Sequence, residues 1–144
     1  MNIEGVGNLL RDFLDEFNVT GVRRTSALIK KENLRSALLA LKRSNVDHLS
    51  AITGVDLGDE ILIIYHIDCG GGELLNLKVK LPKGNLKLPT ITDIFPGAIL
   101  YERDLMEMLG VEVEGHPDPR HLFLPDDWPP DVYPMRKEFL EEKK

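Results

Sequence analysis

The sequence predicts an α+β fold: two amphipathic helices packed on an antiparallel, meander-containing sheet, then a third helical region and an extended proline-rich C-terminal tail. Two early segments repeat apolar residues every three or four positions, which is the period of an amphipathic helix. Three later runs read as strands separated by short glycine turns, the pattern of an antiparallel meander. Six of the nine prolines lie between Pro117 and Pro134, and because each removes a backbone donor, no helix fits there.

The first helix is predicted over residues 3–17, because apolar side chains recur at helical spacing and charged ones fill the opposite face. Asn18 and Gly21 should end it, and residues 22–29 suit a short strand. A second helix is predicted after Asn33, which is a good capping residue. Its apolar stripe is Leu34, Ala37, Leu38 and Leu41.

Three consecutive strands are predicted at residues 49–55, 60–68 and 73–81. Aliphatic and polar residues alternate along the third, so one face of the sheet should be covered by the two helices and the other should be wet. The covered positions are Leu75, Leu77, Val79 and Leu81, and the wet ones are Asn76, Lys78 and Lys80.

A third helical region is predicted from Thr90 or Thr92 to Gly110, interrupted near Pro96. Its apolar stripe is Ala98, Tyr101, Leu105, Met108 and Leu109, and the acidic residues off that stripe are Glu102, Asp104 and Glu107. By themselves these acids indicate a solvated helix face.

We divide the chain into an α+β domain, residues 1–110, and an extended partner-binding segment, residues 111–144. An extended tail cannot bury itself, so either the surface of the domain or a partner must hold it.

The composition argues against several classes of function. A net charge of −6 and a pI near 5.2 disfavour a nucleic-acid partner. No apolar run approaches the roughly 20 residues of a membrane span. The single cysteine, Cys69, can form no internal disulfide and cannot hold an iron–sulfur cluster. We therefore expect an intracellular protein with one core and no cofactor of its own.

His116, Asp118 and His121 lie within six residues, which raises the possibility of a zinc site. Pro117 and Pro119 hold this segment extended, however, and no cysteine or second histidine cluster completes a tetrahedral set, so a structural turn is favoured. A small metal-dependent enzyme using these residues is one alternative function. A soluble acidic module that binds a basic partner is another.

Motifs in the last third of the chain resemble the signature of a known family. Y-E-R-D at 101–104, M-E-M-L-G-V at 106–111, G-H-P-D-P-R at 115–120 and Y-P-M-R-K at 133–137 are similar, in order and spacing, to W-x-E-R-E, D-M-F-G-I, G-H-P-D-L-R-R and H-P-L-R-K. That is the pattern of the C subunit of respiratory complex I, the 30 kDa-type subunit, whose relatives occur in membrane-bound energy-converting hydrogenases. Departures such as Leu100-Tyr101, where the family usually has tryptophan before E-R-E, suggest a distant branch.

The resemblance implies a non-catalytic structural subunit in the hydrophilic arm of a membrane-bound, ion-translocating oxidoreductase of the hydrogenase or complex I type. Such a subunit is active only within its hetero-oligomeric complex, has no active site of its own and is peripheral on the cytoplasmic side of the membrane. It would dock on the large catalytic subunit, called D in complex I, or on the hydrogenase counterpart of that subunit, near a small partner of the B type. The iron–sulfur clusters would lie in these partners.

The resemblance also carries interface positions onto this chain. They are Glu102, Arg103, Asp104, Glu107, His116, Pro117, Asp118, Arg120, Arg136 and Lys137. Arginines suit bidentate carboxylate pairs in a desolvated joint, and tail aromatics suit pockets of a partner. The aromatic anchors expected in the tail are Trp128, Phe123 and Tyr133.

Overall fold

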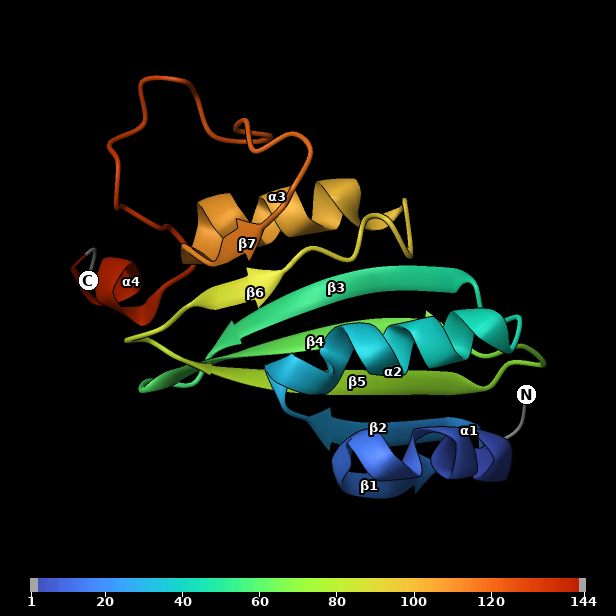
Figure 1. Ribbon diagram of the computed structural model, residues 1–144. Coiled ribbons are helices and arrows are strands. Elements are labelled where there is room, and N and C mark those ends of the chain that lie inside the picture. Colours follow the sequence, from blue (N-terminus) through green and yellow to red (C-terminus); the bar gives the residue numbers. More distant parts are fainter. Residues whose placement is uncertain (1–2, 143–144) are drawn as a thin grey trace.

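Five strands form one mixed sheet in the computed structural model, which describes residues 3–142. Their order across the sheet is β1 (Leu14–Gly21), β2 (Arg24–Ile29), β5 (Leu74–Pro82), β4 (Glu60–Asp68) and β3 (His48–Asp56). Within this sheet β2 and β5 pair in parallel and the other neighbours pair antiparallel. The helices α1 (Ile3–Leu10) and α2 (Lys31–Arg43) lie in front of the sheet in Figure 1. The predicted α+β class is confirmed.

The meander of β3, β4 and β5 matches the three predicted strands to within one residue at each end. Every second residue of β4 and β5 is buried on the side of the sheet that carries the helices, and so is the predicted stripe of α2. Burying one such aliphatic side chain contributes about 1.5–3 kcal/mol before entropy is subtracted, so this layer is the core. Its members include Ile61, Ile63, Tyr65, Ile67, Leu75, Leu77, Val79, Leu81, Leu34, Ala37, Leu38 and Leu41.

The prediction of one helix over residues 3–17 is wrong in its second half. The helix ends at Leu10, a 3₁₀ turn follows over Arg11–Phe13, and β1 begins at Leu14. A register shift between Leu14 and Glu16 sets Leu14 opposite Ile29 and Phe17 opposite Ala27, both of which are core residues. The bulge therefore puts two apolar residues three apart on the same face of a strand, and this spacing is the one that indicated a helix.

Two predicted helix caps are also wrong. The position before α2 is Lys30, and Asn33 lies inside the helix. The third helix, α3 (Ala98–Leu109), starts after Gly97 rather than at Thr90 or Thr92, because Pro96 lacks the N–H that a longer helix would need. The predicted end at Gly110 is confirmed, with a φ of 76° that favours glycine.

Helix α3 is fixed against the edge of the meander. Two short strands, β6 (Lys87–Pro89) and β7 (Glu112–Glu114), pair with each other in parallel. In the sequence, β6 precedes α3 and β7 follows it. The apolar side of α3 packs on β3 at Gly54, where an added Cβ would collide with Leu109 and lie 2.9 Å from Leu105. After β7 the chain loops out beyond α3 and returns to the short helix α4 (Lys137–Glu142) (Figure 1).

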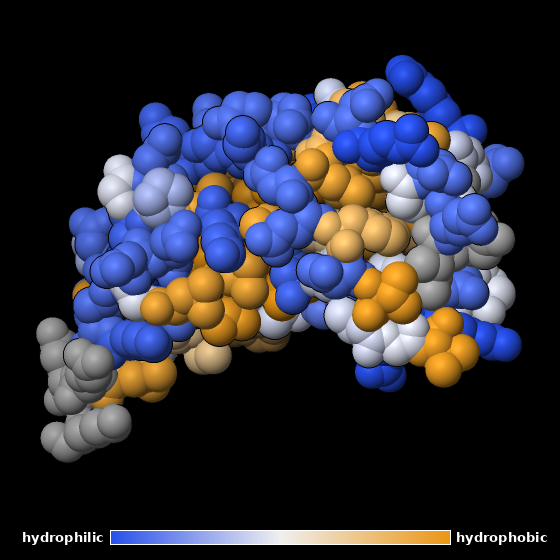
Figure 2. Space-filling view, turned by 90° about the horizontal axis from the view of Figure 1, so that it is seen from below, coloured by the Kyte–Doolittle hydropathy of each residue, from blue (hydrophilic) through white to orange (hydrophobic). Residues whose placement is uncertain are grey.

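The face of the molecule drawn in Figure 2 is largely hydrophilic. Figure 2 shows the molecule from the side of α1 and β1, where hydrophobic residues gather in a band across the middle of an otherwise hydrophilic face. Within residues 3–142, none of the helices is long and apolar enough to cross a membrane.

We expect Gly54→Ala to destabilise the protein, because the new methyl group must displace Leu105 and Leu109 in a packed contact. Overpacking of this kind costs about 1–3 kcal/mol. The free energy of unfolding in urea measures it. Gly84→Ala is the matched control, since a Cβ there meets nothing within 4 Å. Equal stabilities of the two variants would show that α3 does not rest on Gly54.

Candidate functional site

The tail is attached to α3 through the carboxylate of Glu107. This side chain is only 5% exposed. It accepts hydrogen bonds from the backbone amides of Leu122, Phe123 (2.7 Å) and Leu124 (3.0 Å). Successive amides that converge on one anion form a nest, and hydrogen bonds to a charged group are stronger than neutral ones. The tail backbone is therefore wrapped around a carboxylate of its own domain.

Arg103 holds the preceding part of the tail from one helical turn away. Its guanidinium donates to the carbonyl of Arg120 (2.9 Å) and to that of His121 (2.8 Å). It also lies 3.5 Å from the carboxylate of Asp118. Arg103 and Glu107 thus bind opposite groups of the backbone, carbonyls and amides, and together they fix its path over α3.

The G-H-P-D-P-R motif forms a turn on the other end of α3. Nε2 of His116 donates to the carbonyl of Ile99 (3.0 Å), and Nδ1 accepts from the amide of Asp118 (3.0 Å), which assigns the tautomer. Arg120 donates two hydrogen bonds to Asp118 (2.7 and 2.8 Å) and thereby lowers the pKa of that carboxyl to about 2. Pro117 is exposed within the turn.

The three residues of the candidate metal cluster already use ligating atoms in other contacts. His116 uses both nitrogens, Asp118 is paired with Arg120, and His121 donates through Nδ1 to the carbonyl of Pro125 (3.1 Å). Among the described residues, no three histidine, cysteine, aspartate or glutamate side chains are arranged to hold a metal ion.

Glu102 and Glu107 contradict the interpretation of a solvated acidic face. Glu102 is 0% exposed and accepts from the hydroxyl of Thr90 (2.7 Å) and the amide of Ile91 (3.2 Å). Burial raises the pKa of Glu102, although these hydrogen bonds oppose the shift. Burial, together with the nearby charge of Glu107, also raises the pKa of the half-buried Asp104. The acids bind loops that pack onto α3, and hydropathy cannot reveal this.

Asp56, at the end of β3, forms a second attachment that sequence reasoning missed. Its side chain is 3% exposed. It accepts from the amides of Gly58 (2.8 Å) and Lys137 (2.8 Å) and from the ammonium of Lys83 (2.9 Å). Burial alone would raise the pKa of Asp56, but these three donors outweigh it and bring the pKa down to about 2. Lys83 also pairs with Glu138, so the start of α4 is tied to the sheet.

A third attachment involves the end of α3. Arg136 donates to the carbonyl of Leu109 (2.7 Å), and its guanidinium lies 4.6 Å from the centroid of the Tyr133 ring. A Cβ at Gly110 would come within 2.6 Å of both Arg136 and Tyr133. Gly110 is thus required both by its left-handed backbone and by the tail side chains packed on it.

The large apolar side chains of the tail differ in exposure. Trp128 donates to the carbonyl of Val132 (2.7 Å) and packs at a tilt against Phe139. Phe123 is 66% exposed and Met135 is 55% exposed, so both present apolar surface to solvent. Further large apolar residues on the surface of α3 and α4 are Leu100, Tyr101 and Leu140.

Comparisons with known proteins agree with this architecture. Residues 27–144 match the family described as "Respiratory-chain NADH dehydrogenase, 30 Kd subunit". The beta subunit of the membrane-bound hydrogenase of Pyrococcus furiosus is 38% identical over 83% of this chain and 72% of its own length. The C subunit of the F(420)H(2) dehydrogenase of Methanosarcina mazei is 29% identical over 95% of this chain and 89% of its own length.

Two solved structures share the fold. A chain of the membrane-bound sulfane sulfur reductase, an archaeal respiratory membrane complex, superposes with a TM-score of 0.83 and 30% identity over 97% of this chain and 89% of that chain. A trypsin-resistant fragment of Nqo5 superposes with a TM-score of 0.72 over 82% of this chain and 99% of the fragment. At 22% identity the fragment shows a common fold alone.

These matches define the class: this protein is a subunit of a multisubunit oxidoreductase complex of the complex I or membrane-bound hydrogenase type. The chain belongs to the family of 30 kDa subunits of respiratory-chain NADH dehydrogenase. The resemblance of the motifs at 101–137 to the C subunit of complex I is therefore confirmed.

Acid should weaken the attachment of α4, because the pKa of Asp56 in the folded chain, about 2, lies below the ordinary value of 3.8. The stabilisation is complete above the unfolded pKa and is lost as the pH falls through 3.8 towards 2. It amounts to about 2 kcal/mol in full, about half of it lost near pH 3. The free energy of unfolding should therefore fall less steeply between about pH 5 and pH 3 in Asp56→Asn than in the wild type. Asp47→Asn, an exposed control, should follow the wild type.

Glu107→Gln should loosen the tail. Glutamine has the same length, but it lacks the charge and offers one acceptor oxygen to amides that now share two. The loss is about 1.5–3 kcal/mol for a hydrogen bond to a charged group. We expect the amides of residues 122–124 to exchange with solvent at least about tenfold faster. The control is Glu112→Gln, an exposed acid; if both variants exchange alike, Glu107 does not hold the tail.

Proposed function

We propose that this chain is a non-catalytic structural subunit of the hydrophilic arm, which docks on the large catalytic subunit next to its iron–sulfur relay. The single observation that carries the proposal is the grip of Arg103 and Glu107 on the tail backbone. With residues 120–124 of its backbone bound to α3, the tail presents the exposed Phe123 and Met135 on a frame supplied by its own domain. A preorganised surface loses less entropy on docking than a free tail.

The relatives support a large subunit as the partner. A protein of Phocaeicola vulgatus, named for both the C and the D subunits of NADH-quinone oxidoreductase, is 36% identical over 78% of this chain, which corresponds to 22% of that longer protein. Its name joins the two subunits in one polypeptide. We extend this association to the present chain and a large partner of the D type or its hydrogenase counterpart, with a small partner of the B type beside it.

The interface positions divide into two roles in this proposal. Arg103, Glu107 and Arg136 position the tail from inside, as do the buried Glu102 and the turn residue His116. The groups left at the surface would contact the partner directly: Asp104, Pro117, Asp118, Arg120, Lys137 and the outward edge of Trp128. Cofactors and the membrane anchor on the cytoplasmic side would belong to other subunits.

Binding of the large subunit to tail variants tests the proposal. Phe123→Ser removes an exposed ring without touching the fold, and we expect about tenfold weaker co-purification of the two subunits. Val55→Thr is the control, because Val55 is also a half-exposed apolar residue but lies on β3. If Phe123→Ser and Val55→Thr bind equally well, the tail is not the docking surface.

Arg103→Ala and truncation after Gly115 test the role of the frame in the same assay. Both should release the chain from the complex and leave the sheet domain folded, as judged by a cooperative unfolding transition. Arg43→Ala on α2 is the matched control. Full assembly and a full electron-transfer rate after the truncation would overturn the proposal.

A further inference from the structure

The outer edge of β1 is an open strand edge. β1 lies at one end of the sheet, and among residues 3–142 no hydrogen bond from another element reaches its backbone except those from β2. At the opposite end, α3 packs along β3 and the hydroxyl of Tyr101 donates to the carbonyl of Ser50 (2.9 Å). The β3 edge of the sheet is therefore covered by α3, whereas the β1 edge is open.

The sequence of β1 has only part of the usual protection of an open edge, namely two acidic residues and register shifts near both ends. Soluble proteins commonly place lysine or proline on such strands to prevent pairing with another chain. The strand reads L-D-E-F-N-V-T-G, with neither residue. Register shifts occur near both of its ends, but Glu16, Phe17, Asn18 and Val19 pair regularly with β2. This regular stretch offers a template for an added strand.

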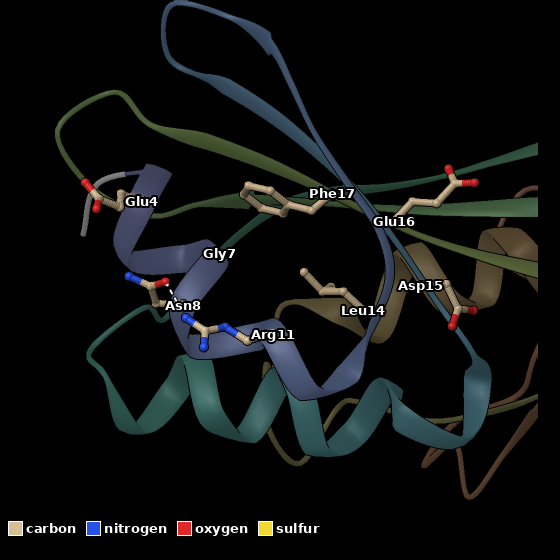
Figure 3. Close-up of a pocket in the computed structure, with 8 residues that line it drawn as sticks. All are labelled: Glu4, Gly7, Asn8, Arg11, Leu14, Asp15, Glu16 and Phe17. Atoms are coloured by element: carbon tan, nitrogen blue, oxygen red, sulfur yellow. Dashed lines mark hydrogen bonds between the residues drawn. The ribbon is translucent and has the colours of Figure 1, made fainter.

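A groove lies beside this edge, between α1 and β1. It has a volume of about 430 Å³. Figure 3 shows the Phe17 ring pointing towards Gly7 and Leu14 projecting into the space between the two elements. A side chain at residue 7 would crowd the Phe17 ring, because a Cβ there would lie 3.2 Å from that ring. The groove has room for one apolar side chain of an added strand.

The apolar surface continues along the hairpin. Val19 shares the helix-side face of β1 with Phe17 and is 63% exposed, and Val22 in the turn is 93% exposed. The added strand would cover these side chains at alternate positions, as in β-strand addition.

The charges around the open edge of β1 indicate what kind of segment could pair with it. Between Glu4 and Glu16 the chain carries four carboxylates and one guanidinium, and that guanidinium, Arg11, donates to Asn8 (3.0 Å) (Figure 3). Arg23 and Arg24 lie at the turn end of the hairpin, and Arg23 donates to the carbonyl of Gly71. The negative field is therefore confined to the part of the edge beside α1, where it favours a basic segment. It disfavours a second copy of this edge and an anionic lipid surface, since both would place like charges together.

We infer that β1 accepts an extended basic segment of another subunit of the complex, which adds a sixth strand to the sheet and places an apolar side chain beside Phe17. The groove is built from residues that precede the family match at 27–144. This edge lies at the opposite end of the sheet from β3, on which α3 packs, so the inference does not depend on where the tail docks.

Amide exchange with single-residue resolution tests the added strand in the purified chain and in the assembled complex. Along residues 16–19 the amides alternate between β2 and the outer edge. Those facing β2 should be slow in both samples. Those on the outer edge should exchange at least about 100-fold more slowly in the complex, and equal rates in the two samples would overturn the inference.

A charge reversal tests the basic character of the segment. In complexes that carry the double variant Asp15→Lys and Glu16→Lys, protection of the outer edge should be lost. Asp47→Lys, an exposed control in the loop between α2 and β3, should keep it. Protection of the β2 amides in the isolated variant shows that the hairpin still forms. If the double variant keeps the protection, the segment is not basic and the inference fails.

A photoreactive residue at Val19 identifies the occupant in the same complex. We expect a crosslink to a peptide of another subunit with lysine or arginine within a few residues. A crosslink to a second copy of this chain, or to lipid only, would overturn the inference.

Discussion

The buried carboxylate of Glu107 is the interaction on which the last third of the chain depends. A carboxylate at 5% exposure is costly unless donors replace water, and here three consecutive tail amides do so. The relation is mutual, because those amides would otherwise lack partners in a segment with six prolines and no regular structure. The carboxylate of Glu107, which the sequence alone would place on a solvated helix face, is thus the group around which the tail folds.

The other attachments extend the same principle along the tail. Arg103 binds carbonyls just before the nest, Arg136 binds the end of α3, and Asp56 binds the first amide of α4. Each joins a charged side chain to backbone groups, and Arg103 and Asp56 also pair with the opposite charges of Asp118 and Lys83. The attachments therefore satisfy polar groups that a proline-rich chain cannot pair locally. The consequence is a tail whose path is set by contacts with its own domain.

A feature was predicted correctly from the sequence where its signal lies in neighbouring residues, and was missed where it depends on residues far apart in the chain. The meander and α2 were predictable, because their alternation and period report directly which side chains are buried. The start of β1 was not, because a bulge gave a strand the spacing of a helix. Glu102 and Asp56 were missed as structural residues, since their partners, Ile91 and Lys137, lie 11 and 81 positions away. The motifs nevertheless pointed to the family, and they contain Arg103, Glu107 and Arg136, which bind the backbone of the tail or of α3.

The amino-acid sequence by itself determined the α+β class, the order of the meander, the end of α3 at Gly110 and membership of the family, since these rest on periodicity, glycine geometry and motif spacing. Only the tertiary structure decided which charges are buried, that the tail is held by its own domain and that β1 is an open edge. The physical reason is that burial and pairing of polar groups depend on which distant backbone atoms come within hydrogen-bonding distance.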